Sequence, residues 1–421
     1  MILPLRFVLW LFLMSNLFYV IVVLLTPPWP SPNQISDDEL RSPFMTDEEV
    51  DYSSKPCNSR YKNGSRPTKE ELSKILQEHL KWIQNPRDGH RANLCNADLK
   101  GIDLSNANLH GANLDRANLT EASLSHADLT NTFLSNANLT KASLAVTNFS
   151  SSQLFFANLT GASLIRTNFN KAILVQSNLK DAKIFWPDFY LTIFELAPGS
   201  LPPTYLMISA KNLSTMRYIS SPLALQELRE AFRKAGMRQQ EREVTYAIKR
   251  NERLQMGLVE ATFSWILFDL TSQYGLAPGN PLRILACLIL VFSIPYQIAL
   301  LPIWKSGIWA IWPADRINPK QDHEVPVRVT ERFFFPNAYG KWWEPFQWTR
   351  TLLGGLYFSL VSAFNIGWRD LNVGNWITRI QPREYVLRGT GWVRFVSGMQ
   401  SLISVYLLAL WFLVYFGHPF D

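Results

Sequence analysis

Six residues near the C-terminal end of the chain stand where the turn of a pore loop would lie: Asn365, Ile366, Gly367, Trp368, Arg369 and Asp370. They end an apolar run that holds no charged residue between positions 351 and 368. A short helix that stops at a glycine can present backbone carbonyls to a passing ion. Charges directly after the run favour a turn back to the side of entry, because an arginine at bilayer depth is costly. We therefore expect a re-entrant, pore-loop-like helix at 351–368.

A second set of polar residues lies in the last apolar stretch. Ser397, Gln400, Ser401 and Ser404 have the spacing i, i+3, i+4 and i+7, which places them on one face of a helix. Polar stripes in membrane helices normally face the interior of a bundle. This polar helix face either lines a pore or joins helices by hydrogen bonds, and its spacing suits both.

The chain contains none of the common sequence motifs for catalysis or metal binding. There is no CxxC pair, no H-x-x-x-H spacing, no G-x-S-x-G and no P-loop. We therefore expect no catalytic site, no metal and no cofactor, and a protein that is not an enzyme. The net charge is +7, but no dense Lys/Arg stripe is present, so we expect no nucleic-acid partner. Cys57 and Cys95 could pair in an oxidising compartment; we favour free thiols.

The elements that must position these residues include three apolar stretches of membrane-spanning length, at 7–25, 284–303 and 395–416. The first could be a cleaved signal peptide. Its apolar run is longer than a usual h-region, and TPPWPSP follows it in place of an A-x-A site, which favours an uncleaved anchor. The bilayer is thus an expected partner.

A period of five residues dominates the middle of the chain. A large apolar residue stands at 19 consecutive fifth positions from Leu94 to Ile184, of which 16 are Leu and two are Phe. Thirteen of the residues two positions earlier are Ala. Period five fits neither a helix nor a flat strand. One buried row requires a corner in every repeat, four corners per coil of about twenty residues, and coils stacked about 4.8 Å apart.

The run ANLHGANLDRANL resembles the A-(D/N)-L-x-x pattern of pentapeptide-repeat proteins. That resemblance implies a right-handed quadrilateral β-helix. Phe133 and Ile173 depart from the pattern, because they put bulk where Asn or Asp usually stands. Some family members mimic DNA through an acidic surface. Residues 91–184 hold eight Lys/Arg against six Asp/Glu, which argues against mimicry here.

Residues 68–85 open with a capping box from Thr68 to Glu71 and continue with apolar residues at helical spacing, which predicts a helix that caps the β-helix. After the repeats, SPLALQELREAFRKAGMRQQEREVTYAIKR predicts a helical hairpin. Ser221 is expected to cap its first helix, Pro222 to stand at N1 and Gly236 to end that helix.

The C-terminal half resembles pentapeptide-repeat proteins that carry a two-transmembrane potassium-channel-like domain. In YFSLVSAFNIGWRDL, Asn365 stands at the threonine of the filter pattern Thr-x-Gly-Tyr-Gly-Asp, and Gly367 and Asp370 match it. Arg369 stands where the second filter glycine belongs. A ring of arginines would repel cations there, so potassium selectivity is not expected.

The expected organisation is a multi-domain chain, a pentapeptide-repeat β-helix joined to an α-helical membrane domain. Its parts are an anchor at 1–30, a polar linker at 31–66, a capping helix at 67–87, the β-helix at 88–186, a connector at 187–220, the hairpin at 221–262 and the membrane domain at 263–421, with a loop at 304–350.

We expect a multi-pass protein of a bacterial inner membrane. Its leading function would be an ion-channel-like pore formed by a homo-oligomer, a tetramer if it conducts. The alternative is a non-conducting, membrane-anchored scaffold whose β-helix binds a protein partner. Basic residues flank both candidate sides, so the positive-inside rule leaves the side of the repeats open.

Overall fold

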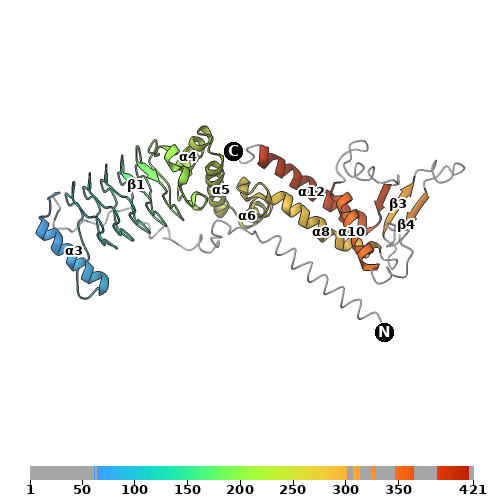
Figure 1. Cartoon of the computed structure of the whole chain (residues 1–421), viewed down its shortest axis with the longest axis horizontal. Helices are drawn as coiled ribbons and strands as arrows, with labels where there is room; N and C mark the ends of the chain where they lie inside the picture. Colours follow the sequence, from blue (N-terminus) through green and yellow to red (C-terminus); the bar gives the residue numbers. More distant parts are fainter. Residues whose placement is uncertain are drawn as a thin grey trace. The chain divides into compact units, whose positions relative to one another are not determined.

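The computed structural model describes residues 61, 64–300, 307–312, 325–328, 347–364 and 386–416 (Figure 1). The chain divides into two compact units, and the boundary between them in the sequence lies between Ile266 and Leu267. The first unit holds the repeats and the hairpin, and the second holds the apolar helices. The expected anchor at 1–30 and residues 365–370 lie outside the described residues.

Helix α3 (Lys69–Gln84) precedes the repeats and begins with the predicted capping box. The Thr68 side chain accepts from the Glu71 backbone N–H at 3.1 Å, and the Glu71 carboxylate accepts from the Thr68 N–H at 3.0 Å. His79 is fully buried on this helix, and its Nδ1 accepts a hydrogen bond from the Ala92 N–H at 3.1 Å. The helix thus satisfies a backbone donor at the start of the first coil, which supports the expected capping role.

The repeats form a β-helix whose coils are twenty residues long. Parallel bridges join each residue to the one twenty positions on, such as Asn93 to Asn113 and Asn118 to Asn138. Most rungs are single bridges; β1 (Ser163–Ile165) and β2 (Lys183–Phe185) are short strands paired in parallel. All 19 predicted inward residues are at most 2% exposed. The inward row continues through the buried Phe189 and Phe194, beyond the expected limit at residue 186.

The corner of each repeat lies two residues after the inward side chain. Every fifth residue from Asn96 to Leu191 has a φ between 51° and 67°, in the left-handed region. Three of these corner residues are glycines and several are asparagines, which tolerate this region. Val146, with φ 60°, is β-branched and is strained there. The period of five thus arises from one left-handed corner per repeat.

Replacing Val146 by Asn should raise the free energy of unfolding by about 1 kcal/mol, because the left-handed conformation costs a non-glycine residue about 1–2 kcal/mol and Asn reduces that cost. Val146 is 43% exposed, so little packing is lost. The matched control is Asn131→Val, at another exposed corner with φ 55°, which should lower stability by a similar amount. Denaturant unfolding would measure both changes, and shifts of the same sign would contradict the strain argument.

Cys95 is disulfide-bonded, and Cys287 is a free, buried thiol. The expectation that Cys95 is a free thiol is therefore wrong. Cys57, the other member of the pair considered from the sequence, lies outside the described residues. Sequence spacing could not decide this point, because a disulfide forms only where the fold brings another cysteine next to Cys95.

The hairpin consists of α4 (Leu223–Lys234) and α5 (Arg238–Gln255), which pack on each other at the C-terminal end of the β-helix, after the short 3₁₀ turns η1 (Thr204–Ser209) and η2 (Leu213–Thr215). Gly236 has φ 71° and ends the first helix as predicted. The start differs by one position, because Pro222 is the N-cap itself and Ser221 Oγ accepts from the Leu223 N–H at 3.3 Å.

In the described part of the second unit, three long helices pack together: α8 (Asn280–Leu300), α10 (Gln347–Ala363) and α12 (Trp392–Phe416). A short helical stretch, α6 (Leu258–Ser264), η3 (Trp265–Asp269), α7 (Leu270–Ser272) and η4 (Gln273–Gly275), leads into α8. By length and composition α8 and α12 could each cross a membrane, whereas the apolar part of α10 is the shorter Thr351–Ala363.

Two strands of a three-stranded antiparallel sheet lie where the sequence predicted a loop at 304–350. The order of the sheet is β4 (Val325–Arg328), β3 (Ile308–Trp312) and β5 (Val386–Gly389). Trp309 and Trp312 thus belong to a strand and not to the loop that we expected at 304–350. Aromatic and branched residues favour strands. The partner β5 comes from a segment far along the chain, which a local reading of the sequence could not supply.

Candidate functional site

The polar helix face predicted from the sequence lies where α8, α10 and α12 pack together. Gly355 on α10 allows the closest approach to α8: a Cβ there would lie 2.5 Å from Cγ of Gln297 and 2.8 Å from the carbonyl oxygen of Ser293. Small residues at such positions let helix backbones approach closely. The aromatic rings of Tyr296 and Phe358 meet edge to face, with centroids 4.7 Å apart. These contacts bring side chains from all three helices into one buried layer.

Gln400 is the centre of a hydrogen-bond network in this layer. The Tyr296 hydroxyl donates to Gln400 Oε1 at 2.8 Å. Gln400 Nε2 donates to the carbonyl oxygen of Ser359 at 3.0 Å and to its Oγ at 2.8 Å. Ser359 Oγ in turn donates to the Ile289 carbonyl oxygen at 2.6 Å. Tyr296, Ser359 and Gln400 are each at most 1% exposed, so the network is closed to solvent.

The remaining predicted residues of the polar helix face occupy the same side of α12 or its edge. Ser397 Oγ donates to Ser362 Oγ on α10 at 3.0 Å. Ser404 is buried, and Ser401 is partly exposed. The arrangement joins α12 to α10 and, through Tyr296, to α8. Within the described residues the face therefore acts chemically as a set of hydrogen bonds between helices.

Sequence reasoning missed Tyr296 as a member of this network. The available signal was the polar spacing Ser293, Tyr296 and Gln297 within an otherwise apolar stretch, at i, i+3 and i+4. Gln297 Nε2 donates to Ser293 Oγ at 3.3 Å, so these polar groups too find partners inside the layer.

The six filter-like residues, Asn365, Ile366, Gly367, Trp368, Arg369 and Asp370, lie outside the described residues. The helix that precedes them ends at Ala363 and is followed by a turn at Phe364. Within the described residues, no group of three or more His, Cys, Asp or Glu side chains could hold a metal ion.

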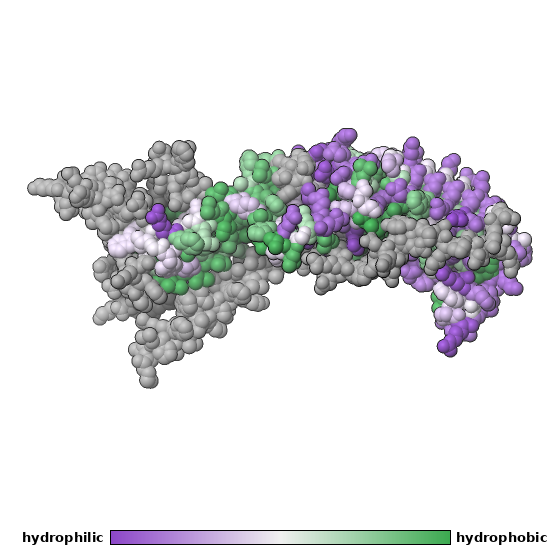
Figure 2. Space-filling view, turned by 180° about the vertical axis from the view of Figure 1, so that it is seen from behind, coloured by the Kyte–Doolittle hydropathy of each residue, from purple (hydrophilic) through white to green (hydrophobic). Residues whose placement is uncertain are grey.

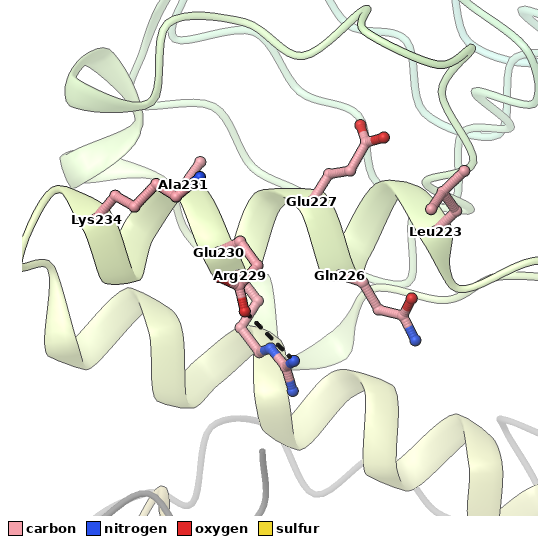
Figure 3. A pocket seen from close by; sticks show the side chains of 7 residues that line it. All are labelled: Leu223, Gln226, Glu227, Arg229, Glu230, Ala231 and Lys234. Carbon is pink, nitrogen blue, oxygen red and sulfur yellow. Dashed lines mark ion pairs between the residues drawn. The ribbon is translucent and has the colours of Figure 1, made fainter.

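A shallow groove lies on α4 in the other unit (Figure 3). Its lining side chains are of mixed charge, and Arg229 and Glu230 form an ion pair at 3.8 Å. The lining residues are Leu223, Gln226, Glu227, Arg229, Glu230, Ala231 and Lys234. The groove combines no nucleophile with a base, and its open shape fits a surface contact better than an enclosed reaction.

Hydropathy differs sharply between the two units. Hydrophobic residues gather on the surface of the apolar helices, and hydrophilic ones cover the repeats (Figure 2). On α12 the exposed side chains include Leu402 at 73%, Phe395 at 69% and Phe412 at 57%. Apolar side chains thus lie on the outer side of α12, while Gln400 and Ser359 are buried between the helices.

Comparison with known proteins bears on the repeats. The family described as Pentapeptide repeats matches in eight copies, over residues 90–125, 117–152 and 147–184. Among solved structures, Rfr23 from the cyanobacterium Cyanothece 51142 is 22% identical; the likeness covers 34% of this chain and 99% of Rfr23, with a TM-score of 0.25.

HetL, a pentapeptide repeat protein involved in heterocyst differentiation regulation in Nostoc sp. strain PCC 7120, is 23% identical. That likeness covers 32% of this chain and 57% of HetL, with a TM-score of 0.19. No curated protein matches the chain. The period, the twenty-residue coils and the family match together identify residues 90–184 as a block of pentapeptide repeats.

Proposed function

We propose that this protein is a membrane-anchored scaffold, in which α8, α10 and α12 lie in lipid and the β-helix binds a protein partner. The observation that carries the proposal is the arrangement of α12, with Leu402 and Phe395 exposed and Gln400 and Ser404 buried. A large exposed apolar surface needs a partner, and lipid is the partner that suits two helices of spanning length.

The scaffold role is favoured over a pore by the closed network around Gln400. A pore-lining amide would face water, whereas the Gln400 amide bonds Tyr296 and Ser359 within one chain. The β-helix adds a rigid surface in which each outward position recurs in every coil. Such a surface suits binding to a protein, and its near balance of charge, with eight Lys/Arg against six Asp/Glu over 91–184, gives no reason for binding nucleic acid.

A pore-loop domain is the second candidate, because α10 is short. Its apolar part, Thr351–Ala363, spans about 20 Å at 1.5 Å per residue, less than the roughly 30 Å of a bilayer core. Such a helix would enter the membrane and turn back. A homotetramer would be needed to surround a path for ions, and Arg369 would stand in that path.

We further propose that the membrane is a bacterial inner membrane and that the β-helix faces its oxidising side. The disulfide at Cys95 supports this side, because protein disulfides persist in oxidising compartments and are rare in the cytosol.

Flux and oligomeric state distinguish the two functions. The scaffold predicts a protein that resists alkaline extraction from membranes, is monomeric in mild detergent, and gives no ion flux in reconstituted vesicles. Arg369→Gly should give no flux either. A tetramer whose flux rises on Arg369→Gly would instead establish the pore.

The topology of α10 is tested by a separate labelling experiment. Cysteines placed at Trp348 and Gln381 should react with an impermeant reagent from the same face, and labelling from opposite faces would exclude a re-entrant helix.

A further inference from the structure

The outer face of the β-helix that contains β1 and β2 changes from polar to aromatic along its length. The bridges of its ladder run through Asp103, Ser123, Ser143, Ser163 and Lys183. The residues two positions after these become larger from coil to coil, in the order Ser105, Ser125, Ala145, Ile165 and Phe185. The early coils therefore present a polar surface on this face, and the last coils present an aromatic one.

The 3₁₀ turn η1 extends this face beyond β2. Corner N–H groups in the repeats donate to a backbone carbonyl oxygen of the next coil, as that of Arg166 does at 2.7 Å. The Trp186 N–H donates instead to Ser209 Oγ at 3.0 Å, so η1 stands where another coil would lie. Trp186 is 51% exposed, and Tyr205 and Ile208 on η1 are 68% and 60% exposed. Three large side chains thus reach solvent at the end of this face.

Two cations stand beside these side chains. The guanidinium of Arg166 lies over the Trp186 ring, with its Cζ atom 5.6 Å from the ring centroid. Stacking uses the flat face of a guanidinium and leaves the N–H groups at its edge available to a carboxylate. Lys183 is exposed, and among the residues that the structure describes neither it nor Arg166 forms an ion pair. Residues 166–186 hold four Lys/Arg against one acidic residue, Asp181, so this coil is positively charged.

We name Arg166, Lys183, Trp186, Tyr205 and Ile208 together the Trp186 patch. We propose that the Trp186 patch binds an acidic segment of a partner protein, which places a carboxylate at Arg166 and Lys183 and an apolar side chain against Trp186. The inference rests on the proposed scaffold function and names the surface and the kind of partner. Trp, Tyr and Arg are the residues that most often carry the binding energy of protein interfaces.

The patch is held in place before a partner arrives. Trp186 occupies a left-handed corner with φ 51°, and its backbone N–H is bonded to Ser209. Lys183 is paired with Ser163 in the parallel strands β1 and β2. On η1, the Ile208 carbonyl oxygen accepts from Nε2 of Gln240, a residue of α5, at 3.0 Å. A surface that is already ordered loses less conformational entropy on binding, which favours affinity.

Anionic lipid headgroups share the negative charge of an acidic protein segment. Surfaces that bind such lipids usually gather about four to eight Lys or Arg residues. The coil 166–186 holds four, but Lys171 and Lys180 belong to other faces, which leaves Arg166 and Lys183 on this one. Two cations around a stacked tryptophan suit one carboxylate-bearing segment, so we favour a protein partner.

The experiment measures binding of short synthetic peptides to the full-length protein in mild detergent by fluorescence anisotropy. One set of peptides combines aromatic residues with several Asp and Glu residues. A second set replaces these acids by Asn and Gln, and a third keeps the acids but replaces the aromatic residues by Ser. The wild-type protein should bind members of the first set only. Trp186→Ala and Arg166→Glu should each weaken that binding at least about tenfold.

The chain offers a matched control for each variant. Phe156 is 52% exposed at a left-handed corner with φ 56°, but on a different face, so Phe156→Ala controls for Trp186→Ala. Lys100 is an exposed cation on another face in an early coil, so Lys100→Glu controls for Arg166→Glu. Both controls should change peptide affinity by less than about twofold.

A charge exchange separates loss of binding from loss of folding. The double variant Arg166→Glu with Lys183→Glu should lose the acidic peptides and should instead bind peptides in which Lys replaces each Asp and Glu. A misfolded protein would bind neither set. Gain of the basic peptides therefore shows that the patch is intact and that its charge selects the partner.

The remaining outcomes would overturn the Trp186 patch. Absence of binding by every acidic aromatic peptide would do so, as would binding that Phe156→Ala abolishes and Trp186→Ala leaves unchanged. The second result would place the partner on another face and leave the scaffold function standing, since flux and oligomeric state test that function separately. In nanodiscs without peptide, protection of Trp186 from hydroxyl radicals that requires phosphatidylglycerol would show that lipid covers the patch instead.

Discussion

Replacing Leu119 by Ala is expected to lower the free energy of unfolding of its coil by about 2–5 kcal/mol, the range for deleting a large buried aliphatic side chain. Leu119 is fully buried in the inward row, and its backbone N–H is bonded to the Asn138 carbonyl oxygen at 2.7 Å in the next coil. The rungs above and below hold that backbone, so the cavity left by the missing atoms cannot close. Hydrogen exchange at the amides of this coil and its neighbours measures the loss.

Glu121→Ala is the matched control for this prediction. Glu121 is the exposed corner of the same repeat, with φ 58°, and Ala takes that conformation at a similar cost. The change should stay within about 0.5 kcal/mol, as is usual for surface substitutions. Equal losses for Leu119→Ala and Glu121→Ala would disprove the inward packing of the row.

Gly355→Ala is expected to destabilise the apolar helices by about 1–3 kcal/mol, the usual cost of overpacking a tight contact. The added Cβ would meet Cγ of Gln297 and the backbone oxygen of Ser293, and the backbone cannot move aside without shifting α8. Such a shift also lengthens the hydrogen bonds of Gln400 to Ser359. Unfolding in mixed detergent, followed by circular dichroism, measures the change.

The matched control for this second prediction is Gly398→Ala on α12. No heavy atom lies within 4 Å of a Cβ built at Gly398, so this change should be neutral or should stabilise the helix by up to about 1 kcal/mol. A loss at Gly398 as large as that at Gly355 would mean that helix contact does not explain the effect.

The folding of residues 90–184 could be predicted from the sequence because the signal is local and repeated. Each five-residue unit carries its own inward side chain, small neighbour and corner. The capping box at Thr68 and the helix end at Gly236 were also predictable, since each depends on residues within one turn. The polar helix face was predictable for the same reason, because helical spacing alone places Ser397, Gln400 and Ser404 together.

Only the tertiary structure decided what these local features meet. The strand β3 needed β5, whose residues lie more than seventy positions away, so its tryptophans were assigned to a loop. The sequence marked Ile173 only as a departure from the repeat pattern. In the structure, stacking of the coils places its side chain in a buried cluster with Phe155 and Ile193. Helical spacing placed Gln400 on a face, but contact with Tyr296 and Ser359 decided that this face bonds other helices. The sequence by itself determined the repeats and helix ends, which depend on neighbours in the chain. The structure decided the pairing of distant segments, because the residues around a side chain in the sequence do not indicate which distant residue it will contact in the fold.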